Sequence, residues 1–452
     1  MNVIVVGAGP VGLLLAAELK LGGADPLVIE RREGPSGEPR ARGIGPLATE
    51  ALVRRGLGAE LAEHDEQGRA DKLRDHGSAK GHFASIFKID QDAQEEPDRR
   101  STLIWQPELE KILLAHARRL DVEIRYGTEL TELHQTADGV IAGGHRADYL
   151  VGCDGGRSTV RKLAGFPFPG TPPLMTVRRV AAQVSGALPP PGRLENGTLV
   201  YGGGMVATFD FDDLDRYDGP ITAEEMQASI KRVAGVDAAV TDVGDGLRFT
   251  DQARQVTDYR RGRVFLAGDA AHVHSPSGGQ GLNLGLMDAV NLGWKLATGR
   301  NDLLDTYNAE RHPVGAAVLH NTRAQSALLR PGPHTDALRD VVSDLMDLPE
   351  VVRYFGRMVS GLGVRHELPY AVGHPLDGTY CPDLHLTYAD GRHGRLSDLT
   401  RAGGLVEIGP PEIISTGRAD LTAALIRPDG VIAWAAPGDS PETLAVARGA
   451  WG

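Results

Sequence analysis

Three glycines near the N-terminus have the spacing of a phosphate-binding turn. Gly7, Gly9 and Gly12 follow an apolar strand and open an apolar helix, and a second strand then ends in Glu30. In such a βαβ unit, backbone N–H groups approach a pyrophosphate at the positive end of the helix, and the acidic residue accepts hydrogen bonds from ribose hydroxyls. NAD, NADP and FAD all use this unit. Glu30 disfavours a ribose 2′-phosphate, although Arg31 beside it weakens that argument.

A second turn that could hold a cofactor lies within residues 263–272, where an apolar strand runs into Gly268 and Asp269. An aspartate at a strand end can accept a hydrogen bond from a ribityl hydroxyl. The helix predicted within residues 273–297 would present free N–H groups to the partly anionic edge of a flavin ring. Simple N-capping of that helix by Asp269 is the alternative. Together with the N-terminal unit, the turn indicates a split site for FAD.

A third strand, within residues 147–165, ends in Asp154 and Gly155 and leads into a helix. The segments GAGPVG, CDGGRSTVRK and RVFLAGDAAHVHSPSGGQGLN, in this order, resemble the single-component FAD-dependent aromatic hydroxylases. The resemblance is closest to the bacterial enzymes that hydroxylate polyketide antibiotics of the anthracycline, angucycline and tetracycline type, and to the rifampicin monooxygenases. It covers nearly the whole chain, because ARQVTDYRRGRV, MDAVNLGWKLA, LLDTYNAERHPV and IRPDGVIAWAAPG also match.

The resemblance implies a set of FAD-binding residues, position by position. The set comprises Gly7, Gly9, Val11 and Gly12 at the pyrophosphate, Glu30 at the adenosine ribose with Arg31 beside it, Arg40 near the pyrophosphate, Gln106 at a helix start on the flavin side, Leu130 at the adenine, Asp154 near FAD and the pyridine nucleotide, Asp269 on the ribityl chain, and Pro276, Gly281, Leu282 and Asn283 along the isoalloxazine ring.

The elements that would position these residues form an α/β fold. The resemblance implies a Rossmann-like FAD-binding domain made from residues 1–168 and 256–335. The substrate-binding sheet domain, residues 169–255, is inserted between them and contains the strand-like stretches VRRVAAQV and LVYGGGMVATFDF. A helical connection at 336–375 would lead to a truncated thioredoxin-like domain at 376–452. The segment 60–105 is polar and charged, and it contains one strand-like stretch, GHFASIFKI. In relatives such a strand reaches over the substrate pocket.

The chain departs from the family at two positions and in length. Relatives often carry arginine where this chain has Leu47, and many carry arginine where it has Cys381. Any nucleotide contact that relatives make with the first of these arginines is therefore not expected in this chain, because leucine occupies that position. The segment after Cys381 is shorter than usual, which affects the expected stability of the C-terminal domain and any dimer contact. The oligomeric state, monomer or homodimer, stays open.

The resemblance implies a two-step flavin cycle. NAD(P)H would reduce FAD, and O₂ would then give a C4a-hydroperoxide whose terminal oxygen passes to an electron-rich carbon of a small aromatic substrate. The protein must bind that substrate beside the ring and exclude water. His82, His272 and His274 are candidates for a base, but a histidine at such a turn is more often a hydrogen-bonded structural residue, so no catalytic residue is assigned.

Other functions compete with aromatic hydroxylation. A Baeyer–Villiger oxygenase would use the same flavin site, so motifs do not separate the two reactions. A flavin-dependent halogenase is disfavoured because its WxWxIP segment is absent. A flavin- or drug-binding protein without turnover is the alternative from a different class.

Composition narrows the partners and the compartment. The net charge of −12 disfavours nucleic acid or an anionic membrane as a partner. The only two cysteines, Cys153 and Cys381, lie far apart and form no disulfide framework or zinc motif, so no metal site is predicted and a reducing cytoplasm is expected. No apolar run approaches the length of a membrane span, and the N-terminal run is too short for a signal peptide.

Overall fold

The centre of the molecule is a six-stranded sheet in the order β19-β20-β9-β1-β2-β5. A computed structural model describes residues 1–76, 80–214, 219–369, 373–418, 420–436 and 441–452. The parallel strands are β1 (Asn2–Val6), β2 (Asp25–Ile29), β5 (Glu123–Arg125), β9 (Tyr149–Gly152) and β20 (Val264–Leu266), and β19 (Arg260–Arg261) pairs antiparallel with β20. The carboxyl ends of the parallel strands meet at one edge, where ligands bind in open α/β sheets.

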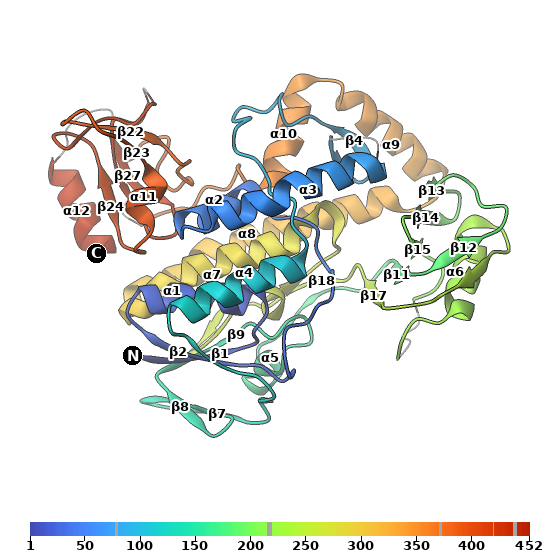
Figure 1. The fold of residues 1–452 in the computed structure, drawn as a ribbon, viewed down its shortest axis with the longest axis horizontal. Helices are drawn as coiled ribbons and strands as arrows, with labels where there is room; N and C mark the ends of the chain where they lie inside the picture. Colours follow the sequence, from blue (N-terminus) through green and yellow to red (C-terminus); the bar gives the residue numbers. More distant parts are fainter. Residues whose placement is uncertain (77–79, 215–218, 370–372, 419, 437–440) are drawn as a thin grey trace.

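Both faces of this sheet are covered, which explains why its central strands β1, β9 and β20 are almost entirely apolar and buried. Figure 1 shows helices across one face and a small antiparallel sheet below the other. The helices are α1 (Pro10–Leu21), α4 (Gln106–Arg119) and α7 (Gln280–Thr298), the small sheet is β6 (Leu133–Thr136), β7 (Gly139–Ala142) and β8 (His145–Ala147), and the short α5 (Thr159–Leu163) follows β9. The largest buried hydrophobic cluster lies between these layers.

A second, antiparallel sheet extends to one side of the central sheet (Figure 1). It has the order β13-β14-β15-β11-β17, with β11 (Thr176–Ala181), β13 (Gly192–Leu194), β14 (Gly197–Gly202), β15 (Met205–Asp210) and β17 (Gly246–Thr250). Helix α6 (Ala223–Ala234) packs on one face, beside the β12 (Gln183–Ser185) and β16 (Ala239–Thr241) pair. The strands β10 (Gly170–Thr171), β18 (Ala253–Gln255) and β21 (His272–Val273) form a bridge back toward the central sheet.

A helical layer lies between the central sheet and the outer edge of the molecule. Its longest member, α8 (Asn301–Leu329), packs against α7, and α9 (Pro333–Leu345) and α10 (Pro349–Ser360) follow it. The helices α2 (Pro46–Arg54) and α3 (Gly58–His76) lead to a hairpin of β3 (Gly81–Phe83) and β4 (Ile86–Ile89), which packs against α10. The strand-like stretch expected at residues 81–89 is therefore two strands with a tight turn between them.

The C-terminal part contains two small antiparallel sheets. One has the order β23-β22-β25 and the other β24-β26-β27, formed by β22 (His385–Tyr388), β23 (His393–Arg395), β24 (Val406–Ile408), β25 (Ile413–Ser415), β26 (Ala423–Ile426) and β27 (Ile432–Ala436), with α11 (Leu396–Thr400) and α12 (Pro441–Trp451) beside them. Trp434 and Trp451 are buried in the same cluster as α1 and α7. The C-terminal part therefore shares its core with the N-terminal half of the chain.

The layers agree with the α/β fold expected from the sequence, whereas the exact domain bounds stay a prediction. In the part of the chain that the structure describes, no helix is both long and apolar enough to cross a membrane.

Candidate functional site

The carboxyl ends of the central strands open into a cavity of about 1190 Å³. A typical small-molecule pocket has roughly 300–1,000 Å³, so this cavity has room for a large cofactor and a second molecule. All predicted site residues except Gly12 lie on its wall: Gly7, Gly9, Val11, Glu30, Arg31, Arg40, Gln106, Leu130, Asp154, Asp269, Pro276, Gly281, Leu282 and Asn283. The structure therefore brings them together, and their contact with FAD stays a prediction.

The three N-terminal glycines have different physical roles. A Cβ atom on Gly12 would lie 1.9 Å from the carbonyl oxygen of Gly7, and one on Gly7 would lie 2.5 Å from that of Cys153. These two glycines therefore allow close packing of backbone against backbone. Gly9 lies on the cavity wall, and no protein atom lies within 4 Å of the place its Cβ would take. That open space at the N-terminus of α1, whose N-cap Gly9 supplies no side-chain acceptor, fits a pyrophosphate.

Glu30 directly follows β2 and places an ionised carboxylate at the cavity. Its Oε2 accepts a hydrogen bond from the backbone N of Ala8 at 2.9 Å, and its Oε1 accepts one from the backbone N of Arg32 at 3.0 Å. Burial opposes ionisation, but the hydrogen bonds from Arg32 and Ala8 lower the pKa of Glu30. A carboxylate fixed in this way can accept hydrogen bonds from ribose hydroxyls.

Asp269 follows β20 in a single 3₁₀ turn and lies exposed on the cavity wall. Gly268 has φ +62°, a left-handed conformation that favours glycine at this turn. The alternative that Asp269 caps the following helix is wrong, because α7 begins at Gln280 and its N-cap is Gly279. The described residues supply no hydrogen-bond partner for the Asp269 carboxylate, so it is available to a ligand hydroxyl.

The turn at Gly268 is held from behind by a buried carboxylate that sequence reasoning missed. Asp288, on α7, accepts hydrogen bonds from the backbone N of Gly268 at 3.0 Å and from Nε2 of His272 at 2.7 Å on one oxygen, and from Nε of Arg311 at 2.8 Å on the other. Burial opposes ionisation, but Arg311 and His272 hold the pKa of Asp288 below its ordinary value. Asp288 and Arg311 belong to the stretches MDAVNLGWKLA and LLDTYNAERHPV, which match the family. Neither stretch indicated that these two side chains would form an ion pair.

The three candidate histidines differ in their access to the cavity. His272 is fully buried and bound to Asp288, and it is not part of the cavity wall. His274 and His82 both line the cavity. His274 Nδ1 lies 2.7 Å from the carbonyl oxygen of Ser275, and burial lowers the pKa of His274, so its ring is neutral at pH 7. The structure gives none of these histidines the role of a base.

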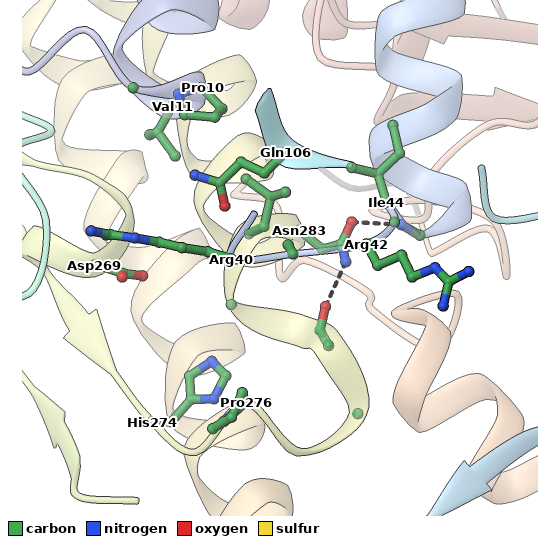
Figure 2. A pocket seen from close by; sticks show the side chains of 18 of the residues that line it. Pro10, Val11, Arg40, Arg42, Ile44, Gln106, Asp269, His274, Pro276 and Asn283 are labelled. Atoms are coloured by element: carbon green, nitrogen blue, oxygen red, sulfur yellow. Dashed lines mark hydrogen bonds between the residues drawn. The ribbon is translucent and has the colours of Figure 1, made fainter. Parts of the chain in front are cut away.

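Asp154 and Asn283 line the cavity but also have structural hydrogen bonds. The Asp154 carboxylate accepts hydrogen bonds from the hydroxyl of Ser158 and the backbone N of Thr159, the latter at 2.7 Å, and so fixes the start of α5. The side chain of Asn283 accepts a hydrogen bond from the backbone N of Gly45 at 2.6 Å, and Figure 2 shows it between that segment and the start of α7. Asp154 therefore shapes the wall without offering a free carboxylate.

Arg40, on the loop after β2, and Gln106, at the start of α4, both line the cavity. Gln106 is the first residue of α4, as expected, and its backbone N donates to the carbonyl oxygen of Ala41 at 2.9 Å. Arg40 is exposed and forms an ion pair with Glu38 at 2.6 Å. Figure 2 shows Arg40, Gln106 and Asp269 on the walls of the same part of the cavity.

The two departures from the family both lie in the interior. Leu47 is buried in α2, and Cys381 is fully buried. Burial raises the pKa of the Cys381 thiol to about 12, so it is an unreactive thiol at neutral pH. Among the described residues, no group of three or more His, Cys, Asp or Glu side chains could hold a metal ion.

One cavity is lined by a glycine turn, a glutamate that follows a strand and an aspartate that follows another strand. This arrangement is typical of a dinucleotide-binding flavoprotein. The FAD binding domain family matches residues 1–322. The chain belongs to this family and is an FAD-dependent monooxygenase, which confirms the α/β fold class, the cofactor and the resemblance seen in the sequence.

Individual relatives extend over almost the whole chain. The chain is 39% identical to 12-dehydrotetracycline 5-monooxygenase/anhydrotetracycline 6-monooxygenase of Streptomyces rimosus subsp. rimosus, covering 98% of this chain and 96% of that protein. It is 37% identical to rifampicin monooxygenase of Streptomyces venezuelae, covering 100% and 98%. The solved structure of OxyS anhydrotetracycline hydroxylase from Streptomyces rimosus superposes with a TM-score of 0.87 at 37% identity, covering 100% of this chain and 99% of that one. A dialkyldecalin synthase of Streptomyces rugosporus is 36% identical over 98% and 97%.

Proposed function

We propose that this monooxygenase hydroxylates a polycyclic aromatic substrate of the polyketide-antibiotic type, with NAD(P)H as reductant and O₂ as the source of oxygen. The single observation that carries the proposal is the cavity at the carboxyl edge of the central sheet, which is lined by all but one of the predicted FAD-binding residues. Its volume of about 1190 Å³ leaves room for a multi-ring substrate beside the cofactor. The names of the relatives support the substrate class.

The residues of the chain would hold FAD at three points. The N-terminus of α1 at Gly9 would bind the pyrophosphate, Glu30 the adenosine ribose, and Asp269 a ribityl hydroxyl. The first N–H groups of α7, at Gln280 and Gly281, have no partner within the helix and would face the ring edge that becomes anionic on reduction. When bound, FAD supplies the two-electron reduction and the activation of O₂.

The substrate would lie against the wall opposite these contacts. Phe87 and Ile89 of β4 line that wall, and Val359 and Leu362 line it at the end of α10. These side chains are apolar, so they would exclude water and contact the faces of aromatic rings. Phe87 is 51% exposed, which is high for a phenylalanine and fits a side chain that a substrate covers. No catalytic base forms part of the proposal.

A second candidate is cyclisation of a polyketide without transfer of oxygen. The observation that favours it is the 36% identity to a dialkyldecalin synthase, which is close to the identity with the monooxygenases. Baeyer–Villiger oxygenation is a third outcome of the same flavin site, because the reaction differs in the attacked carbon rather than in the cofactor contacts.

The test is incubation of the FAD-loaded enzyme with NADPH, isotopically labelled O₂ and a panel of anthracyclinones, angucyclinones, tetracycline precursors and ansamycins. We expect one panel member to gain one labelled oxygen atom on an aromatic ring, with NADPH consumed in equal amount. A ring-expanded ester would show Baeyer–Villiger chemistry, and an isomer without added oxygen would show cyclisation. If no member gains oxygen, hydroxylation of this substrate class is wrong.

A further inference from the structure

Three buried amide side chains form one chain of hydrogen bonds behind the cavity wall. Gln325 Oε1 accepts from the backbone N of Ala84 at 3.0 Å, and Gln325 Nε2 donates to Asn321 Oδ1 at 3.0 Å. Asn321 Nδ2 donates to Gln280 Oε1 at 2.7 Å, and Gln280 Nε2 donates to two carbonyl oxygens at the end of α10, at 3.1 and 3.2 Å. The three side chains belong to residues that are at most 5% exposed, and none of them lines the cavity.

The direction of this amide chain is fixed by its two ends. It begins at the backbone N–H of Ala84, which can only donate, and it ends at the carbonyl oxygens of Met358 and Val359, which can only accept. Reversing any one of the three amides would therefore place donor against donor and acceptor against acceptor. Asn321 and Gln325 can continue the chain because they lie four residues apart on one face of α8. Hydrogen bonds in such a chain polarise one another, so cutting one link weakens its neighbours.

The amide chain joins three segments that line the cavity but lie far apart in the sequence. One is the β3–β4 hairpin, which lines the cavity with Phe87 and Ile89. Another is the end of α10, which lines it with Val359. The third is the 3₁₀ turn Ser277–Gly279, which contacts β3 and directly precedes Gln280, the first residue of α7. The wall proposed to contact the substrate is thus tied to the turn predicted to pack along the flavin ring.

The turn of the hairpin needs such contacts, because its backbone conformation is unfavourable. Ala84 and Ser85 have φ +49° and +62°, in the left-handed region that disfavours residues with a Cβ atom. A conformation of this kind persists only where the surrounding structure holds it. Gln325 holds the backbone N of Ala84, and Arg339 of α9 donates to its carbonyl oxygen at 2.8 Å. Loss of the Gln325 contact is therefore expected to move the turn and the strand β4 that follows it.

We propose that Gln280, Asn321 and Gln325 are positioning residues that hold the substrate wall at a fixed distance from the flavin ring. The proposal rests on the proposed function, which places the substrate between that wall and the ring. A displacement of about 1 Å from the reacting geometry can lower a rate by roughly 100-fold. Apolar side chains of the same volume would fill this space with similar stability, but they would not fix the direction in which the three segments are joined. The amide chain is therefore expected to determine what fraction of the NADPH consumed leads to hydroxylated product.

The first test cuts the amide chain at Asn321, whose side-chain hydrogen bonds reach neither the hairpin nor α10. Asn321→Leu keeps a similar side-chain volume and removes both links. In the FAD-loaded enzyme without substrate, amide hydrogen exchange within residues 81–89 is expected to become about 5- to 10-fold faster. The matched control is Asn308→Leu, because Asn308 also lies on α8 and accepts a hydrogen bond from the backbone N of Tyr259 at 2.9 Å, away from the cavity wall. It should leave exchange within residues 81–89 unchanged.

The second test measures turnover with the panel member that gains oxygen. In Asn321→Leu, the KM for that substrate is expected to rise by about 3- to 10-fold. The product formed per NADPH consumed should fall by about twofold or more, with the difference recovered as hydrogen peroxide. The kcat for NADPH consumption and the FAD content should stay within about twofold of the parent, because the three points proposed to hold FAD lie outside the amide chain. Asn308→Leu should keep the parent's ratio of product to NADPH even if it lowers the Tm.

The two tests separate this proposal from the proposed function. If no panel member gains oxygen, the proposed function is wrong, whereas the exchange measurement needs neither NADPH nor substrate and still decides whether the amide chain holds the wall. The positioning role is overturned if Asn321→Leu exchanges within residues 81–89 like the parent, or if its ratio of product to NADPH is unchanged. Gln325→Met cuts the chain at the next link with a flexible side chain, and the same outcomes apply to it if Asn321→Leu does not fold.

Discussion

Asp154 and Asp269 both follow strands of the central sheet and both line the cavity, yet only one of them is free to bind a ligand. The carboxylate of Asp154 accepts hydrogen bonds from Ser158 and from the backbone of α5. Asp269 is exposed and precedes no helix that it could cap, because Gly279 is the N-cap of α7. The same residue type at the same kind of strand end thus shapes the wall in one case and offers an acceptor in the other.

Asp269→Ala is therefore expected to weaken FAD binding without unfolding the protein. A hydrogen bond from a ribityl hydroxyl to a carboxylate contributes about 1.5–3 kcal/mol, so the Kd for FAD should rise by roughly 10- to 100-fold. Titration of the apoprotein with FAD measures this change. Asp302→Ala is the control, because Asp302 is an exposed residue that pairs with Arg300 and is not part of the cavity wall. Unchanged FAD affinity in Asp269→Ala would contradict the site assignment.

His366 makes the stability of the protein depend on pH. Its Nε2 lies 3.1 Å from the hydroxyl of Tyr380, and burial lowers the pKa of His366 from 6.5 to about 4. Between these values the unfolded chain binds a proton that the folded chain does not. The contribution of neutral His366 to the free energy of unfolding is therefore complete above pH 6.5. It is lost as the pH falls, by about 2 kcal/mol at pH 5.

Urea unfolding at pH 7.5 and pH 5 checks this expectation in His366→Gln. The variant should lose about 1 kcal/mol at pH 7.5, where the contact with Tyr380 is gone, but its further loss on acidification should be about 2 kcal/mol smaller than in the parent. His134→Gln serves as the control, since His134 is exposed and should leave the pH profile as it is. Equal acid sensitivity of the parent and His366→Gln would show that other groups dominate.

At the scale of elements, the turn between β1 and α1 combines two kinds of glycine. Gly9→Ala places its methyl group in the open space of the cavity, so the apoprotein should keep its Tm while the Kd for FAD rises about tenfold or more. Gly12→Ala places a methyl group 1.9 Å from a backbone oxygen of Gly7, so the apoprotein itself should lose several degrees in Tm. Calorimetry of both apoproteins, followed by FAD titration, distinguishes the two. A large loss of apoprotein stability in Gly9→Ala would mean that this turn is structural only.

The elements that local sequence patterns define were predicted well. The strand and glycine turn at Gly7 and the strand before Asp269 each depend on neighbouring residues, and each is present. The helix start at Gln106, which the family resemblance implied, is present as well. The helix α3 was not predicted, because its sequence is polar and lacks an apolar face that would mark it. The strand β21 was also missed, since two residues next to a turn carry no periodic signal.

The parts of the site that pair distant residues could not be predicted. Asp288 lies 20 positions from the Gly268 that it holds, and Asn283 lies 238 positions from Gly45. Neither residue differs in type or spacing from an ordinary polar residue on a helix. The residues that the family resemblance indicated line one cavity, with the exception of Gly12. Whether a carboxylate is free or occupied, as for Asp154, depends on contacts that only the folded chain defines.

At the scale of the whole molecule, the short C-terminal part is held to the rest by buried charges. Arg427 donates to both carboxylate oxygens of Glu310 at 2.9 and 2.7 Å, and it also pairs with Asp429. Lys295 of α7 completes the cluster at 2.9 Å from Glu310. The guanidinium of Arg427 lies 4.6 Å from the ring centroid of Trp451. The short length of the C-terminal part was expected to lower its stability. A fully buried charge cluster nevertheless joins this part to α7 and α8.

Arg427→Met tests whether this contact holds the molecule together. Removing Arg427 leaves the buried Asp429 carboxylate without its ion-pair partner and leaves Glu310 with Lys295 alone, which costs about 3–5 kcal/mol. We expect the C-terminal part to separate from α7 and α8 at lower urea than the parent needs, with a red shift in the fluorescence of Trp434 and Trp451. Arg448→Met, which removes an exposed pair with Glu407 in the same part of the chain, should cost at most about 1 kcal/mol.

The same variant should also weaken FAD binding, although Arg427 is not part of the cavity wall. Glu310, which binds Arg427, is followed on α8 by Arg311, and Arg311 binds the Asp288 carboxylate that fixes the Gly268 turn. A shift of α8 would therefore reach the turn that presents Asp269. We expect the Kd for FAD to rise by about 3- to 10-fold, corresponding to roughly 1 kcal/mol. If Arg427→Met loses stability but binds FAD like the parent, the C-terminal contact stabilises the fold without positioning the cofactor turn.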